Sequence, residues 1–256
     1  METVFHGQGP VVVAHRGSRL LWPENTMTAF ENAASHGVRF FETDLRASAD
    51  GVLHCFHDFF LDRTTDGSGP IASKSAAELA RLDAGYRHRQ GDGFPFRGQA
   101  IGIPTLEAVL DRFPDAGFVV DLKADGVVEP LSRLVRERHL EGRLIAGSFS
   151  TARLAELQER CRAATATGPL ETIRAMVGGR LDSAIDPFGP STVSLSVPVS
   201  WYGVPVVTPE LVEVADRHGR LIQAWTINEP EEMKKLVELG VDGIITDRPD
   251  LAAGII

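Results

Sequence analysis

Short runs of β-branched and other apolar residues alternate with helical patterns along almost the whole chain. Parallel strands need a crossover between them, usually a helix, so this alternation predicts βα units rather than hairpins. Eight such units in 256 residues favour an α/β fold of the (β/α)8 (TIM) barrel type. The eight predicted strands are residues 11–14, 40–45, 117–122, 144–149, 162–165, 192–197, 221–226 and 243–246.

An open, doubly wound sheet is the alternative arrangement of such units. It is disfavoured because no Gly-x-Gly-x-x-Gly motif follows the first strand. Helix boundaries support the alternation: Thr26 is placed to cap a helix over residues 26–36, and Thr208-Pro209 opens another. Residues 52–57, after the Asp50-Gly51 turn, are expected to pair with the second strand.

Residues 59–103 interrupt the alternation. They are rich in Gly, Asp, Arg and Ser and carry one short helical pattern, at residues 75–82. We expect this segment to be an excursion after the second strand, at the mouth of the barrel and too small for a separate domain. Residues 1–256 therefore read as a single domain.

Composition excludes several classes of protein. A net charge of −9 argues against nucleic-acid binding, and no apolar run approaches the roughly 20 residues that span a bilayer. The two cysteines, Cys55 and Cys161, lie too far apart in sequence to suggest a zinc motif or a disulfide framework. Residues 1–10 show no secretory signal, so we expect a cytoplasmic protein without stable membrane insertion.

Carboxylates gather near the predicted strand ends, where a barrel places its active site. Glu42 and Asp44 are two residues apart on one strand and so face the same side, and Asp121 lies on the next parallel strand. Buried together, they would need a cation, and Mg²⁺ or Ca²⁺ prefers such oxygen ligands. The alternative is that they face helices or solvent and pair with arginines.

Two histidines, His15 and His57, follow predicted strands. Imidazoles can donate or accept a proton near neutral pH, so the pair could supply an acid and a base. Either could instead be an ordinary hydrogen-bonded core histidine. Arg16 and Lys123 would add two positive charges at the same rim, suited to a phosphate, unless they serve only as ion-pair partners of the carboxylates.

An ordered set of short motifs runs through the chain, and together they resemble the glycerophosphodiester phosphodiesterase family. The resemblance covers nearly the whole chain apart from residues 153–206. The motifs are His15-Arg16-Gly17, Pro23-Glu24-Asn25-Thr26, Glu42-x-Asp44, Asp50-Gly51, His57-Asp58, Leu61-Asp62-Arg63-Thr64-Thr65, Pro104-Thr105-Leu106, Trp225-Thr226-Ile227-Asn228 and Gly240-Val241-Asp242-Gly243-Ile244-Ile245-Thr246-Asp247.

The resemblance implies a metal-dependent barrel of lipid and glycerol metabolism. Such an enzyme hydrolyses glycerophosphodiesters, which are small molecules, to glycerol 3-phosphate and an alcohol. The chain departs from the family at its third metal carboxylate, normally a glutamate, which is the shorter aspartate here. The implied roles are acid–base catalysis for His15 and His57, metal binding for Glu42, Asp44 and Asp121, phosphate contact for Arg16 and Lys123, and glycerol contact for Trp225.

Two other functions remain open from the sequence. A lysophospholipase D on the same barrel would need an apolar trough, for which Trp22, Phe59 and Phe60 are weak support. A non-catalytic phosphate-binding barrel is the second, although such a protein would be expected to have lost some of the histidines and carboxylates. The sequence predicts no particular oligomeric state.

Overall fold

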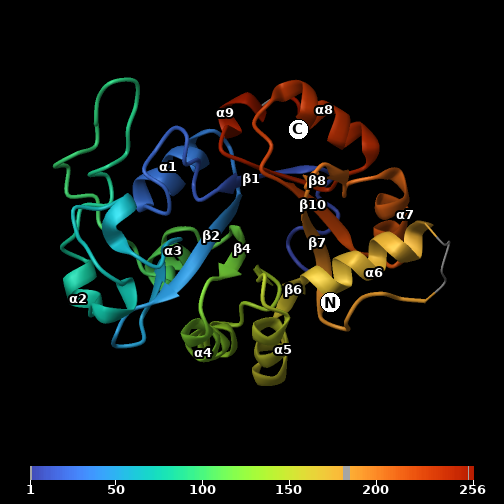
Figure 1. Cartoon of the computed structure of the whole chain (residues 1–256), viewed down its shortest axis with the longest axis horizontal. Coiled ribbons are helices and arrows are strands. Elements are labelled where there is room, and N and C mark those ends of the chain that lie inside the picture. The colour runs from blue at the N-terminus through green and yellow to red at the C-terminus, as the bar shows by residue number, and fades with distance from the viewer. Residues whose placement is uncertain (1, 181–184, 253) are drawn as a thin grey trace.

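Eight parallel strands form a closed barrel in the computed structural model, which describes residues 2–180, 185–252 and 254–256. The first strand pairs with both the second and the last, which closes the ring. The predicted (β/α)8 barrel is therefore confirmed (Figure 1). Its strands are β1 Val11–His15, β2 Phe40–Ala47, β4 Gly117–Leu122, β5 Leu144–Gly147, β6 Ala164–Ala166, β7 Thr192–Pro198, β10 Leu221–Trp225 and β11 Gly243–Thr246.

A helix follows each barrel strand before the next one begins. The first shows how the sequence sets its start: the Thr26 hydroxyl accepts a hydrogen bond of 3.2 Å from the Ala29 N–H, as expected for an N-cap. The helices surround the strands (Figure 1). They are α1 Met27–Ser35, α3 Leu106–Arg112, α4 Val128–Arg138 (after the 3-10 turn η3, Asp125–Val127), α5 Thr151–Arg160, α6 Pro169–Arg180, α7 Pro209–Arg217, α8 Pro230–Leu239 and α9 Pro249–Ala252.

Two predicted strands each lose two residues at one end. The run at residues 144–149 stops at Gly147, because the Ser148 hydroxyl turns to donate to the Leu122 carbonyl and Phe149 is exposed. The run at residues 162–165 begins two residues later, at Ala164. In both cases apolar content marked the strand, but pairing with the neighbouring strands determined its ends.

The inside of the barrel is apolar at one end and polar at the other. Val13, Phe40 and Val119 lie in one buried cluster, and Phe5 covers Phe40 with ring centroids 4.6 Å apart. Because strand side chains alternate, the next inward positions after these residues are two further along each strand. Those positions are His15, Glu42 and Asp121.

The excursion begins after β3 Leu53–Cys55, which pairs antiparallel with β2 as predicted for residues 52–57. It contains α2 Ala76–Leu79 within the predicted helical stretch. Two 3-10 turns also belong to it, η1 Leu61–Arg63 and η2 Ile71–Ser73. Its small apolar cluster includes Phe56, next to β3, and the rest extends away from the barrel (Figure 1). That the whole chain is one domain stays a prediction.

A hairpin that the sequence did not reveal follows β7. Its strands are β8 Ser200–Trp201 and β9 Val204–Pro205, and both residues at its tip, Tyr202 and Gly203, have positive φ angles of 47° and 78°. Two positive φ angles are what a tight two-residue turn of this kind requires. In the part of the chain that the structure describes, no helix is long and apolar enough to cross a bilayer.

Candidate active site

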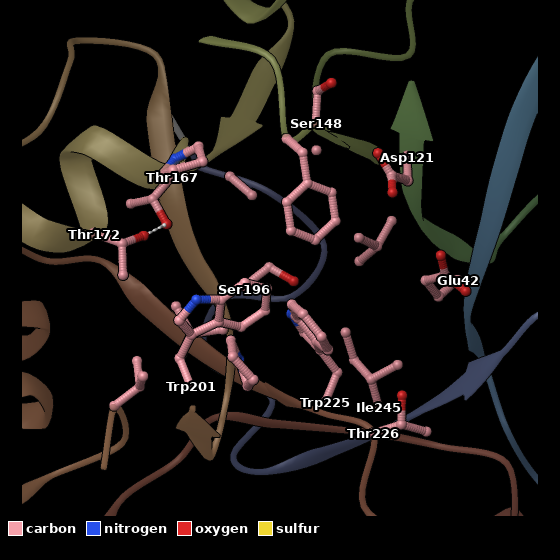
Figure 2. A pocket seen from close by; sticks show the side chains of 18 of the residues that line it. Glu42, Asp121, Ser148, Thr167, Thr172, Ser196, Trp201, Trp225, Thr226 and Ile245 are labelled. Carbon is pink, nitrogen blue, oxygen red and sulfur yellow. Dashed lines mark hydrogen bonds between the residues drawn. The ribbon is translucent and has the colours of Figure 1, made fainter. Parts of the chain in front are cut away.

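A cavity of about 750 Å³ opens at the carboxyl ends of the barrel strands. All eight site residues predicted from the sequence line it, from five different strands or the loops that follow them. Figure 2 shows Glu42 and Asp121 on one side and Trp201, Thr167 and Thr172 on the other. The predicted residues in its wall are His15, Arg16, Glu42, Asp44, His57, Asp121, Lys123 and Trp225.

The turn after β1 places His15 and Arg16 in this wall. Arg16 has a φ of 50° and Gly17 a φ of 72°, so the chain reverses at once after the strand. A Cβ at Gly17 would lie only 2.9 Å from the backbone of Ala29 and Phe30 in α1. Glycine is therefore required, because the turn packs directly on the helix that follows it.

His15 is held by a buried carboxylate. Its Nδ1 lies 2.6 Å from Asp247 Oδ1, at the end of β11, and Asp247 also accepts from Arg19 Nε at 3.1 Å and from Asn228 Nδ2 at 3.2 Å. Burial alone would raise the pKa of Asp247, but the contacts with His15 and Arg19 outweigh it and lower that pKa. An ionised carboxylate only accepts, so Nδ1 is the donor of this contact, and Nε2, on the other side of the ring, lies 3.8 Å from Glu42 Oε2.

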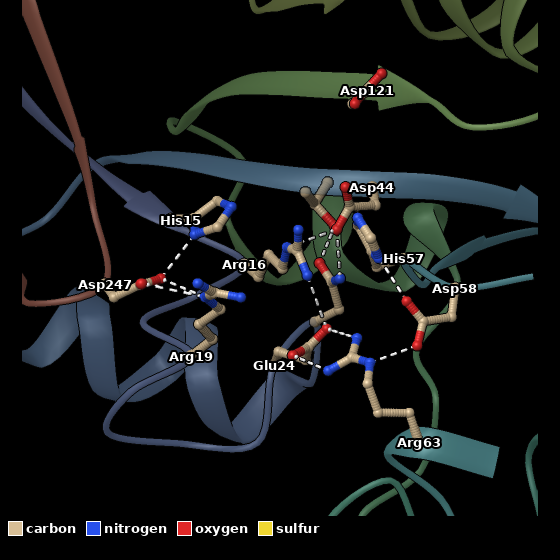
Figure 3. A network of polar contacts seen from close by, with 12 residues as sticks. His15, Arg16, Arg19, Glu24, Asp44, His57, Asp58, Arg63, Asp121 and Asp247 are labelled. Carbon is tan, nitrogen blue, oxygen red and sulfur yellow. Dashed lines mark hydrogen bonds and ion pairs between the residues drawn. The ribbon is translucent and has the colours of Figure 1, made fainter. Parts of the chain in front are cut away.

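His57 is held in a similar way by its neighbour in sequence. Its Nδ1 lies 2.6 Å from Asp58 Oδ1. Arg63, from the excursion, pairs with Asp58 and donates to Glu24 Oε2 at 2.9 Å. Burial lowers the pKa of His57, which favours its neutral form at pH 7. In Figure 3 the two histidines lie on either side of Arg16 and Asp44.

Asp44 is the centre of the charged network. One of its oxygens lies 2.9 Å from Lys123 Nζ, and the other lies 3.0 Å from Arg16 Nε and accepts from Asn25 Nδ2 at 2.9 Å. Burial by itself would raise the pKa of Asp44, but Arg16 and Lys123 lower it to about 2. Asn25 is fixed in turn because its carbonyl oxygen accepts from the Thr43 hydroxyl at 2.7 Å. The network keeps both cations at the cavity.

Glu42 and Asp121 are the two less satisfied carboxylates. Burial and the charge of Asp44 raise the pKa of Glu42 to about 7, and burial also raises the pKa of Asp121. Asp121 Oδ2 lies 2.5 Å from Lys123 Nζ, whereas its Oδ1 is buried and has no hydrogen-bond partner among the described residues. Two acidic groups whose ionised forms are disfavoured, one with a free oxygen, provide a donor set that a divalent cation would satisfy.

The three predicted metal ligands do not form a compact cluster in this structure. Of the residues that the structure describes, no group of three or more His, Cys, Asp or Glu side chains is gathered closely enough to hold a metal ion. Lys123 Nζ contacts both Asp44 and Asp121 and so takes part of the place where a cation would bind. The residues fit a metal in chemistry, and the predicted metal site stays a prediction.

Four residues that contact the predicted site residues were not assigned a role from the sequence, although all four lie in its motifs. They are Glu24, Asn25, Asp58 and Asp247. Asp247 directly follows the last strand, so the strand pattern predicts its place at the barrel mouth. The pattern does not predict its partner, because His15 lies 232 residues away in sequence.

Comparison with known proteins identifies the family to which the chain belongs. The profile of the glycerophosphoryl diester phosphodiesterase family matches residues 15–251. The chain is 34% identical to "Probable glycerophosphodiester phosphodiesterase 2" of Mycobacterium tuberculosis, over 100% of this chain and 94% of that protein. The chain belongs to the glycerophosphoryl diester phosphodiesterase family, which confirms the resemblance.

Solved structures extend the comparison to the fold. The glycerophosphoryl diester phosphodiesterase domain of an uncharacterised protein from Mycobacterium tuberculosis superposes with a TM-score of 0.86 at 24% identity, covering 96% of this chain and 98% of that one. An Oleispira antarctica phosphodiesterase in complex with the product sn-glycerol-3-phosphate superposes with a TM-score of 0.74 at 26% identity. That match covers 98% of each chain.

Proposed function

We propose that this protein hydrolyses glycerophosphodiesters to glycerol 3-phosphate and an alcohol, with His15 and His57 as the acid–base pair. The observation that carries the proposal is geometric: two histidines, each oriented by a carboxylate, line one cavity together with Arg16 and Lys123. The family name and the product-bound relative support the choice of substrate.

The two imidazoles have complementary roles, one as general base and the other as general acid. Each donates a hydrogen bond from its Nδ1–H to a carboxylate, so each has Nε2 free to exchange a proton with the substrate. One takes the proton of the attacking oxygen, and the other protonates the leaving alkoxide. A substrate with a nitrophenolate leaving group assigns these roles, because its departure needs no proton and only loss of the base would slow it.

Arg16 and Lys123 are suited to hold the phosphate. A guanidinium fork and an ammonium point charge can contact different phosphate oxygens and stabilise the charge that develops on them. Asp44 orients both side chains. Trp225 lies in the same wall and offers an apolar surface to the glycerol carbons.

Glu42, Asp44 and Asp121 would hold the divalent ion, Mg²⁺ or Ca²⁺. When bound, such an ion supplies a Lewis acid next to a phosphoryl oxygen. The buried, unpartnered Asp121 Oδ1 and the raised pKa of Glu42 support this assignment. A cytoplasmic location, a role in lipid and glycerol metabolism, and the lack of nucleic-acid binding stay predictions of the sequence.

Release of glycerol 3-phosphate from glycerophosphocholine tests the proposal. The protein is stripped with chelator, and Mg²⁺ or Ca²⁺ is returned singly. We expect release that depends on the ion, and we expect Glu42→Ala to abolish both this release and the rise in melting temperature that the ion gives. Absence of release with either ion, from a folded protein, would overturn the proposal.

A further inference from the structure

A second cavity lies beside the active site, between the loop after β1 and the excursion. Its volume is about 280 Å³, and Arg19 is the one described residue that lines both cavities. We call it the basic cavity, because four arginines line it against a single carboxylate, Glu24. The arginines are Arg19, Arg63, Arg87 and Arg89. In a chain of net charge −9, such a local excess of positive charge favours binding of an anion.

The two sides of the basic cavity are joined without a ligand. Arg63, in the excursion, donates to Glu24 Oε1 at 2.6 Å and to Oε2 at 2.9 Å. Gln90 Nε2, also in the excursion, donates to the Leu21 carbonyl at 2.6 Å. The cavity is therefore preformed, and its one carboxylate already has a cationic partner.

Two of the arginines keep their terminal nitrogens available. Arg87 is fixed through Nε, which donates to the Thr65 carbonyl at 3.0 Å, and it has no acidic partner among the described residues. Arg19 likewise donates through Nε, to both oxygens of Asp247 at 3.1 Å. A guanidinium group held at Nε can still offer its Nη atoms to a phosphate in the two-pronged geometry that arginine favours.

Buried polar atoms in the same wall give an independent indication of a ligand. The Thr64 Oγ1 and His88 Nε2 atoms are buried and have no hydrogen-bond partner among the described residues, and both residues line the basic cavity. Unsatisfied buried groups are uncommon in native proteins, and an ion that binds there is one of their ordinary explanations. A ligand with several oxygens would accept from the hydroxyl and from an imidazole protonated at Nε2.

We infer that the basic cavity is a regulatory anion site, which binds a phosphate dianion, free or in a small phosphate monoester, and that its occupancy lowers kcat. The cavity is smaller than the roughly 300–1,000 Å³ that encloses drug-sized ligands. Its donors come from both sides, and a tetrahedral phosphate presents oxygens in several directions. Binding at this site does not depend on the proposed function; only its effect on the rate does.

Arg63 gives the basic cavity a route to the active site. All three of its guanidinium nitrogens are engaged, Nε by Asp58 and the two Nη atoms by Glu24 (Figure 3). An anion that contacts Arg63 must therefore compete with these carboxylates. Asp58 holds His57 through a contact of 2.6 Å, so this competition loosens the orientation of the imidazole. Such a change slows the chemical step rather than substrate binding.

Equilibrium dialysis of the metal-free protein with labelled inorganic phosphate tests the site. Arg87→Gln is compared with Arg81→Gln, an equally exposed arginine of the excursion that lines neither cavity. Phosphate bound at the active site is common to all the proteins. We expect Arg87→Gln to bind one equivalent of phosphate at least tenfold more weakly than the wild type, and Arg81→Gln to match the wild type. Equal binding by all three proteins would overturn the inference.

Competition in the same dialysis distinguishes the two sources of phosphate. The labelled phosphate whose binding depends on Arg87 is displaced with unlabelled phosphate or with glycerol 3-phosphate. Displacement by glycerol 3-phosphate at the lower concentration identifies the monoester as the preferred ligand. Displacement by inorganic phosphate at the lower concentration identifies the free ion.

The effect on the rate is measured as choline release from glycerophosphocholine with Mg²⁺ and increasing phosphate. We expect phosphate to lower kcat several-fold in the wild type and in Arg81→Gln. In Arg87→Gln it should only raise KM, through competition at the active site. A wild-type kcat that phosphate leaves unchanged would overturn the inference. If the protein does not hydrolyse glycerophosphocholine at all, the proposed function fails, whereas the dialysis still decides whether the anion site exists.

Discussion

Asp44 shows how much of this site depends on a single buried residue. Its two oxygens contact Arg16, Lys123 and Asn25, and it is almost completely buried. Removing the charge leaves two cations side by side in the wall without their shared counter-ion. Breaking a buried ion pair by removing one partner commonly costs about 3–5 kcal/mol, so the network stabilises the fold as well as orienting the cations.

We therefore predict that Asp44→Asn lowers the free energy of unfolding by about 3–5 kcal/mol, measured in urea. The matched control is Asp125→Asn, which breaks the pair with Arg153 at a side chain that is 83% exposed. An exposed pair is worth less than about 1 kcal/mol. Equal losses in the two variants would show that Asp44 is no more than a surface charge in energetic terms.

Ionisation of Glu42 makes the free energy of unfolding depend on pH. The sign is opposite to that for Asp44, because the pKa of Asp44 is lowered and that of Glu42 is raised. Burial and Asp44 raise its pKa to about 7, so the folded state holds the proton more tightly than the unfolded chain does. The stabilisation from that proton is complete below the ordinary pKa of 4.5 and is lost as the pH rises through about 7.

In the presence of chelator, ionisation of Glu42 should make the free energy of unfolding fall by about 2–3 kcal/mol between pH 5 and pH 8. Glu42→Gln, which cannot ionise, should lack that part of the fall. Denaturant titrations of the wild type and the variant at several pH values measure the difference directly. Parallel pH curves for the two proteins would contradict the raised pKa.

At the scale of elements, the β1–α1 turn is the most constrained connection. Gly17 has a positive φ and no room for a side chain, whereas Gly37, after the other end of α1, has a positive φ of 84° and open space around it. The pair separates two costs of a Cβ. One is the backbone strain that both positions share, and the other is crowding, which only Gly17 suffers.

We predict that Gly17→Ala destabilises the protein by about 2–4 kcal/mol and that Gly37→Ala costs about 1 kcal/mol, through backbone strain. The excess at Gly17 should appear also as lost activity, because moving the turn shifts His15 and Arg16. Thermal unfolding and glycerol 3-phosphate release measure the two effects. Equal stability losses at the two glycines would show that the turn does not pack on α1 as described.

Across the whole molecule, the sequence predicts the barrel well because each βα unit carries its own signal. Strand patterns and helix caps are local signals, and eight βα units in order leave few alternative folds. The inward positions of His15, Glu42, Asp44 and Asp121 follow from alternation along the strands. What local signals cannot supply is pairing between distant residues, so the role of Asp247 appeared only in the folded chain.

Sequence analysis missed the apolar residues of the cavity wall, among them Phe149, Ile173 and Trp201, for a different reason. Helix α6 has apolar residues on more than one face, which reads as a buried helix, and the β8–β9 hairpin is only two residues long on each side. Neither pattern shows that its side chains face a cavity. The excursion, in which Phe59 and Phe60 were weak support for an apolar trough, contributes Arg63 to the polar network, and none of residues 59–103, all of them described, lines the active-site cavity.

The most direct test of the account is kcat for glycerophosphocholine in His15→Ala and His57→Ala, with folding checked by circular dichroism. His139→Asn, at the exposed C-terminal end of α4 and outside the cavity wall, serves as the control. We predict that each site variant loses roughly 10²- to 10⁴-fold in kcat and that the control keeps the wild-type rate. A wild-type rate in either site variant would contradict acid–base catalysis by this pair.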